Sequence, residues 1–328
     1  MADSLRYVSK HSTLPGWPNG ITSYGLWYLL TLRDWYWYSG NCDLVEELSY
    51  YWKPLLLNLL ALVHEEESES LREEELERGY FLDWPSKDHP EAKGGIYALF
   101  KLALCAAEEL CCVVNDTSLA EQCARKAEVL GRTSFEPGEK KQVTAMLQLA
   151  GMTNREQARV SLTVGGGRGM STFQSYYILK AVAQTADVST AISMLQEYYG
   201  GMLKVGATTF WEDFDLDWMR DGATIEEVLP EGVYDIHGDN GRYCYKGFRH
   251  SLCHGWSAGP TAFLAEEVLG IRIESPGCRK VSVQPNLGNL TWVKGTYPTP
   301  QGIIAVEAKR VGDTVETHVD VPNSIELV

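Results

Sequence analysis

The chain has 328 residues, of which 45% are hydrophobic and 22% charged, and its formal net charge is −15. This composition is that of a globular protein with a buried core, and the length suits one large and one small domain. The acidic charge disfavours phosphate backbones and anionic lipid, so we expect neither nucleic acid nor a membrane as a partner. The sequence has no run of about 18 apolar residues, and its N-terminus does not show the basic segment followed by an apolar one that is typical of a signal peptide. These two features predict a cytoplasmic protein.

The first two thirds of the chain show helical spacing of apolar residues, interrupted by glycine, proline and asparagine. Residues 1–13 are typical of the last turns of a helix, and the helix expected at 43–64 contains Pro54, which predicts a kink. Between helices, residues 65–78 carry a glutamate run typical of a solvated helix end or loop. The remaining helices are expected at 21–40, 93–114, 118–131, 137–151, 154–163, 173–186, 188–203 and 254–269.

The pattern changes in the last third. Residues 204–250 are rich in Gly, Asp, Trp and Tyr and weakly periodic, and long ordered loops of this kind are usually functional. After residue 272, alternating apolar residues and turn residues predict a small β domain of four or five strands. We therefore expect a mainly α protein, with a helical-barrel domain over 1–272 and a β-sandwich-like domain over 273–328. The succession of paired helices is typical of an (α/α)6-type barrel, but the expected helices are too few to close such a barrel.

One segment combines acids with aromatic side chains. Residues 206–218 hold four carboxylates within six positions, Glu212 to Asp217, interleaved with tryptophan and phenylalanine. Aromatic faces stack on sugar rings and carboxylates perform acid–base chemistry, so the segment suits glycoside hydrolysis. A solvated acidic loop pinned by core aromatics fits the spacing equally well.

Histidines and cysteines do not predict a metal site. A zinc centre needs at least three ligands, and His237, His250 and His254 match no zinc-binding spacing. The eight cysteines form no CxxC pair and are expected to be reduced structural thiols. We expect no metal and no cofactor.

Several segments resemble bacterial α-L-rhamnosidases, family 78 of the glycoside hydrolases, in the right order over nearly the whole chain. They are residues 15–17 (PGW), 19–20 (NG), 23–24 (SY), 81–86 (FLDWPS), 168–173 (RGMSTF), 206–218 (GATTFWEDFDLDW), 235–239 (DIHGD), 243–256 (YCYKGFRHSLCHGW) and 298–302 (PTPQG).

The resemblance implies an (α/α)6 barrel and an inverting hydrolase acting on terminal α-L-rhamnosides, in a rhamnose-containing glycoside or polysaccharide. It assigns the general base to Glu212. Substrate contacts fall on Trp17, Asp83, Trp84, Trp211 and His254. We expect the three tryptophans and His254 to line one cavity with Glu212.

The sequence departs from the family at its start, because residues 1–13 hold no match to the motif that carries the family's general acid. The general acid is therefore unassigned, and we expect the chain alone to be inactive and to self-associate through its N-terminal helices. Two alternatives remain open: a non-catalytic or degenerate carbohydrate-binding remnant, and another α/α-barrel enzyme such as an unsaturated-uronyl hydrolase or a lyase. An arginine-lined pocket would favour the last, since uronates carry a carboxylate.

Overall fold

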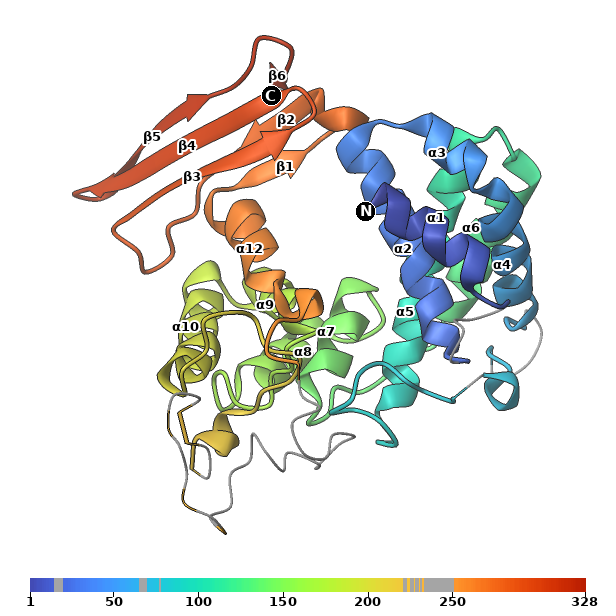
Figure 1. Cartoon of the computed structure of the whole chain (residues 1–328), viewed down its shortest axis with the longest axis horizontal. Coiled ribbons are helices and arrows are strands. Elements are labelled where there is room, and N and C mark those ends of the chain that lie inside the picture. The colour runs from blue at the N-terminus through green and yellow to red at the C-terminus, as the bar shows by residue number, and fades with distance from the viewer. Residues whose placement is uncertain are drawn as a thin grey trace.

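The computed structural model describes residues 1–14, 20–64, 70–76, 78–220 and 251–328, together with residues 223, 224, 227, 230 and 232. A mainly helical region is followed by two small sheets, which confirms the expected fold class (Figure 1). The helices are α1 (Ala2–His11), α2 (Thr22–Ser39), α3 (Cys42–Glu47), α4 (Ser49–Ala61), α5 (Ala92–Val113), α6 (Thr117–Gly131), α7 (Lys141–Leu149), α8 (Arg155–Thr163), α9 (Ser175–Thr185), α10 (Val188–Lys204) and α12 (Gly259–Phe263).

Short polar side chains fix several helix starts. Asn41, Asp116, Asn154 and Asp187 each accept a hydrogen bond from a backbone N–H in the first turn of the helix that follows. These N–H groups have no partner inside the helix, so the side-chain oxygen satisfies a donor that would otherwise need water.

Two expected helices differ in detail. The segment predicted at 43–64 is divided at Leu48 into α3 and α4, and Pro54 lies inside α4 rather than at the break. The segment predicted at 254–269 consists of a 3₁₀ turn, η3 (Gly255–Ser257), then α12, then a π-helical turn, η4 (Leu264–Val268). The Leu269 N–H donates to the Leu264 carbonyl, the wider spacing that defines a π turn.

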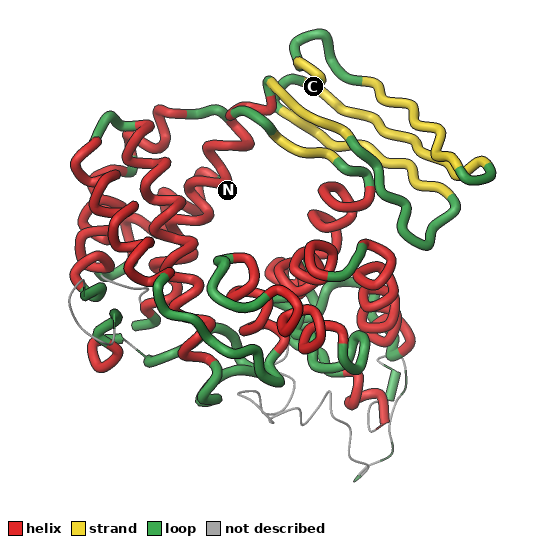
Figure 2. The backbone as a smooth tube through the Cα atoms, turned by 180° about the vertical axis from the view of Figure 1, so that it is seen from behind, coloured by secondary structure: helices red, strands yellow, loops and turns green. Residues whose placement is uncertain are grey.

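Five helices form an inner series. α2 packs on α5, α5 on α7, α7 on α9 and α9 on α12, while α6, α8 and α10 pack outside their neighbours. A hollow of about 950 Å³ is lined from all five, by residues such as Leu30, Leu102, Met146, Tyr177 and Ala262. In the described part of the chain α12 and α2, the two ends of the series, do not form a comparable packing, and both views show the series open between them (Figures 1 and 2).

The buried apolar residues form two separate clusters in the helical region. The first joins α1 to α7 and is mainly aliphatic, with Leu29, Leu55 and Leu99 fully buried. The second runs from α7 to the β domain and is rich in aromatic side chains, including Trp211 and Trp218.

The β domain contains two three-stranded sheets. One holds β1 (Ile271–Ile273), β2 (Lys280–Val283) and β6 (Glu326–Leu327), with β2 antiparallel to β1 and parallel to β6. The other is an antiparallel meander of β3 (Trp292–Thr299), β4 (Gly302–Val311) and β5 (Thr314–Asp320). Their shared core is Ile271, Val281, Ile304, Val306 and Ile325.

The β domain contacts the end of α2. Gly40 and Gly277 both have positive φ, and a Cβ on Gly40 would lie 3.0 Å from the Gly277 Cα, so the close approach needs glycine. The Tyr38 hydroxyl donates to the Pro298 carbonyl at 2.8 Å. No helix in the described ranges is both long and apolar enough to cross a membrane.

Candidate functional site

Glu212 lies where two irregular segments run side by side. The first follows α10, and the second leads into η3. The Glu212 N–H donates to the Ser251 carbonyl at 2.8 Å, and the His254 N–H donates to the Phe210 carbonyl at 2.8 Å. These two bonds bring Glu212 and His254 together.

The Glu212 carboxylate is shielded but accessible. Its side chain is 13% exposed, its Oε2 accepts from the Ser251 N–H at 3.1 Å, and the same oxygen lies 3.8 Å from His254 Nδ1. These contacts place a partly exposed carboxylate beside an imidazole.

Asp83 serves the interior of the protein. It is 1% exposed and accepts from the Ser86 N–H at 3.0 Å, the Ser171 hydroxyl at 2.7 Å and the Gln142 side-chain amide at 3.3 Å. Burial raises its pKa, and the hydrogen bonds from Ser86, Ser171 and Gln142 oppose that rise. Asp83 joins its own loop to Gln142 and to Ser171 through these bonds. Because its carboxylate is buried, it is not exposed for the sugar contact that we expected of it.

Asp213 is a second buried carboxylate, next to Glu212 in the chain. It is 2% exposed, and burial raises its pKa to about 8, with the charge of nearby Asp83 adding to the effect and the Phe214 N–H opposing it. The loop of Asp83 and Trp84 lies beside the Glu212 segment, because the neighbouring residues Ser171 and Thr172 bond to Asp83 and to the Glu212 carbonyl. A negative charge on one of the two buried acids disfavours a negative charge on the other.

The predicted tryptophans fall in three different situations. Trp211 is 0% exposed and packs edge-on against Phe214 in the second core, so it has no face for a sugar, and the expected cavity lining is corrected on this point. Trp84 is partly exposed and packs edge-on against Phe81 at 4.9 Å. Trp17, like His237 and His250, lies outside the described residues.

Two residues at the site were quoted in motifs but given no role. The Thr172 hydroxyl and the Trp256 Nε1 both donate to the Glu212 carbonyl, at 2.5 and 2.6 Å. Trp256 also stacks on Phe173, with ring centroids 5.0 Å apart and planes at 17°. No spacing rule links Thr172 and Trp256 to Glu212, because they lie far apart in the chain. The only signal for these residues in the sequence was the aromatic content of their two motifs.

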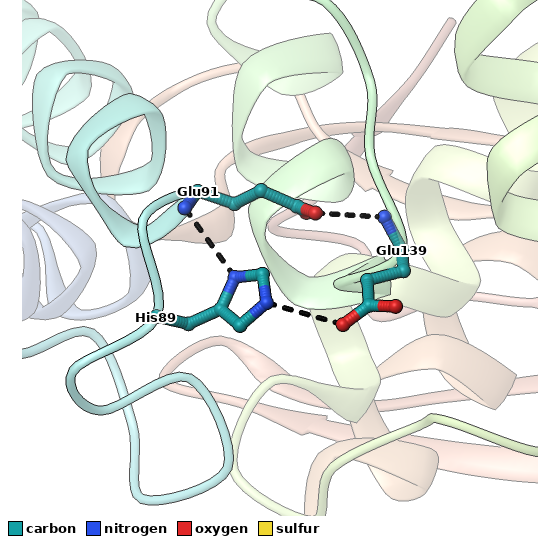
Figure 3. A group of neighbouring side chains, drawn as sticks. All are labelled: His89, Glu91 and Glu139. Carbon is teal, nitrogen blue, oxygen red and sulfur yellow. Dashed lines mark hydrogen bonds and ion pairs between the residues drawn. The ribbon is translucent and has the colours of Figure 1, made fainter.

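Among the described residues, one group has the donor atoms for a metal ion: His89, Glu91 and Glu139, whose ligand atoms lie within 4.8 Å of one another (Figure 3). Both Glu91 oxygens already accept backbone N–H groups, from Glu139 at 3.0 Å and Lys140 at 2.9 Å. His89 Nε2 pairs with the Glu139 carboxylate at 3.1 Å. Through these contacts the group joins the residues just before α5 to the residues just before α7. We call these three residues the clamp between α5 and α7.

Residues 270–328 match the family model of the bacterial alpha-L-rhamnosidase C-terminal domain. No curated protein matches the sequence. Among solved structures, the chain is similar to the family 78 rhamnosidase of Bacillus sp. GL1, with 22% identity and a TM-score of 0.70, over 94% of this chain and 33% of that one.

Two further solved structures are similar. One is the α-L-rhamnosidase of Streptomyces avermitilis complexed with L-rhamnose, at 13% identity and a TM-score of 0.69, over 98% of this chain and 32% of that one. The other is the α-L-rhamnosidase of Dictyoglumus thermophilum, at 14% identity and a TM-score of 0.72, over 99% and 38%. The chain spans about a third of the length of these proteins.

These likenesses confirm the resemblance seen in the sequence: the chain has the fold of the α-L-rhamnosidases over nearly its whole length, and residues 270–328 match the model of the bacterial alpha-L-rhamnosidase C-terminal domain.

Proposed function

We propose that this chain is the helical core and β cap of an inverting α-L-rhamnosidase, acting on terminal rhamnosyl groups of a glycoside or polysaccharide, with Glu212 as general base. The observation that carries the proposal is the Glu212 carboxylate, 13% exposed and 3.8 Å from His254 Nδ1, on a segment fixed by Ser251. The L-rhamnose complex of the Streptomyces avermitilis relative supports the choice of sugar.

The general acid is not among the buried neighbours of Glu212. Asp83 and Asp213 are at most 2% exposed, so neither reaches the leaving oxygen of a bound glycoside. An inverting enzyme needs its two carboxyl groups roughly 6.5–9.5 Å apart on opposite sides of the sugar. We therefore propose neither Asp83 nor Asp213 as the general acid, which stays unassigned.

Leaving-group chemistry separates the two halves of the mechanism. A dinitrophenolate departs without a proton, whereas a methoxide leaving group requires one. The inactivity expected of the chain alone therefore applies to glycosides whose leaving group needs a proton. We expect the chain to leave methyl α-L-rhamnoside intact and to hydrolyse only the dinitrophenyl glycoside, releasing the inverted anomer first.

The decisive variant is Glu212→Gln, which is nearly isosteric but cannot accept the water's proton. Turnover of the dinitrophenyl glycoside should fall by roughly 10²–10⁴ while the melting temperature stays unchanged. Glu307→Gln, on the exposed surface of β4, is the matched control and should behave as the unsubstituted chain. Equal rates for the two variants would show that the base lies elsewhere.

A non-catalytic carbohydrate-binding role is the second candidate. The burial of both Asp83 and Asp213, which removes these two carboxyls from contact with a bound sugar, favours this reading. It predicts saturable L-rhamnose binding by calorimetry and no turnover even of the dinitrophenyl glycoside.

We also propose that the chain self-associates through its N-terminal helices. An apolar hollow of about 280 Å³ lies between α1, α2 and the Glu212 region, lined by residues that include Leu5, Val8, Trp27 and Trp256. Met1 and Tyr7, each 65% exposed, extend this apolar surface. Sedimentation over a range of concentrations tests it; a monomer throughout would contradict it.

A further inference from the structure

The peptide carbonyl of Glu212 is held by two side chains from different segments. It accepts two hydrogen bonds, from Thr172 Oγ1 at 2.5 Å and Trp256 Nε1 at 2.6 Å, which together use both lone pairs of the oxygen. The Glu212 N–H is bonded as well, to the Ser251 carbonyl. Both peptide groups flanking the Glu212 Cα are therefore fixed, and they define the anchor from which the side chain extends.

The two donors are themselves fixed from different directions. Thr172 is 2% exposed and lies just before α9. The Trp256 indole stacks on Phe173, and Phe173 packs edge-on against Trp27 of α2 with centroids 5.3 Å apart. Trp256 also contacts the His254 ring, at 4.8 Å between centroids. The anchor of Glu212 thus depends on α2, on the entry to α9 and on η3 at once.

We propose that Trp256 and Thr172 are positioning residues that set the direction of the Glu212 carboxylate toward its water. The inference rests on the proposed role of Glu212 as general base. Neither donor touches the carboxylate, so each acts through the peptide to which that side chain is attached. Displacement of a reacting group by about 1 Å costs on the order of 10²-fold in rate, so a loosened anchor should lower kcat.

Two substitutions remove the donors with little change of shape. Trp256→Phe keeps an aromatic ring against Phe173 and loses the N–H, and Thr172→Val keeps the branched shape and loses the hydroxyl. On dinitrophenyl α-L-rhamnoside each should lower kcat by roughly 10-fold or more and leave KM within about two-fold. Thr172→Ser, which retains the hydroxyl, should restore kcat.

The matched control is Trp37→Phe. Trp37 Nε1 also donates a single hydrogen bond, to Glu109 at 2.5 Å, but between α2 and α5. Its loss should leave kcat unchanged. A kcat for Trp256→Phe equal to that of Trp37→Phe would overturn the proposal, and so would a fall in Thr172→Ser as large as in Thr172→Val.

A second measurement does not need turnover. Amide hydrogen exchange of peptides covering residues 209–213 should accelerate in Trp256→Phe and in Thr172→Val, but not in Trp37→Phe, at unchanged melting temperature. If the unsubstituted chain hydrolyses no rhamnoside, the proposed function fails, while the exchange result still decides whether these donors hold Glu212. Unchanged exchange at 209–213 in both variants would refute the anchoring.

Discussion

The two hydrophobic clusters described in the helical region differ in the types of side chain that form them. The first, from α1 to α7, is formed mainly by leucine and alanine side chains on long helices. The second, around Glu212, places Trp211, Phe214 and Trp218 beside two buried carboxylates, Asp83 and Asp213. The first region is packed mainly with apolar side chains. The second holds ionisable groups in a low-dielectric environment; burying them costs stability, and groups buried in this way are common where proteins carry out chemistry.

The largest expected effect comes from a cavity in the first cluster. Leu99 is 0% exposed, so Leu99→Ala should lower the free energy of unfolding by about 2–5 kcal/mol in urea titrations. Leu57→Ala on α4, where the side chain is 52% exposed, should change it by less than about 0.5 kcal/mol. Similar costs for the two variants would mean that the first cluster is not a packed core.

The next prediction tests the cost of charge in the second cluster. The pKa of Asp213 is raised from 3.8 to about 8, so the folded state retains a proton that the unfolded state has lost. Stability from this group is therefore present below pH 4 and is lost as the pH rises to about 8, at no more than about 1.4 kcal/mol per pH unit.

Asp213→Asn removes this titration. The free energy of unfolding of the variant, relative to the unsubstituted chain, should rise steadily over the same pH window. Chemical denaturation at a series of pH values measures it. Parallel curves for the two proteins would show that Asp213 titrates normally, and the contrast between the two clusters would lose its electrostatic part.

A smaller effect is expected at the clamp between α5 and α7, which joins the two regions. Glu91→Gln should cost about 1–2 kcal/mol, because the Glu139 and Lys140 N–H groups each bond to a different carboxylate oxygen and the amide NH2 that replaces one of them cannot accept. Glu139→Gln, at a side chain 72% exposed that pairs with His89, should cost less than about 1 kcal/mol. If the order of the two variants is reversed, the Glu91 bonds do not join the helices.

The smallest effect is expected on the surface of the β domain. Lys294 and Glu307 face each other across β3 and β4, 2.8 Å apart, with side chains 66% and 54% exposed. Lys294→Ala should shift the free energy of unfolding by at most about 0.5 kcal/mol, and less at high salt. A larger loss would indicate that the β domain depends on charge more than on its apolar core.

The regular parts of the fold could be predicted from the sequence because they depend on local periodicity. Helices such as α5 and α10 and strands such as β4 appear where apolar spacing placed them, and the order of helical region and β domain is the expected one. Local patterns erred at Leu48, where two α-helices meet at a break, and in the π turn at 264–268, where the helix type changes. We retain the domain division at residue 272 as a proposal.

For the site, residue types and motifs indicated which side chains could do the chemistry: a Trp-Glu-Asp run and a histidine at a helix entry. Which of these side chains meet solvent depends on tertiary packing. It exposed Glu212 in part, buried Asp83, Asp213 and Trp211, and recruited Trp256 to the Glu212 carbonyl. Neighbours in sequence such as Glu212 and Asp213 share composition and charge, but whether a carboxylate meets water or the core depends on segments far away in the chain, which no local pattern records.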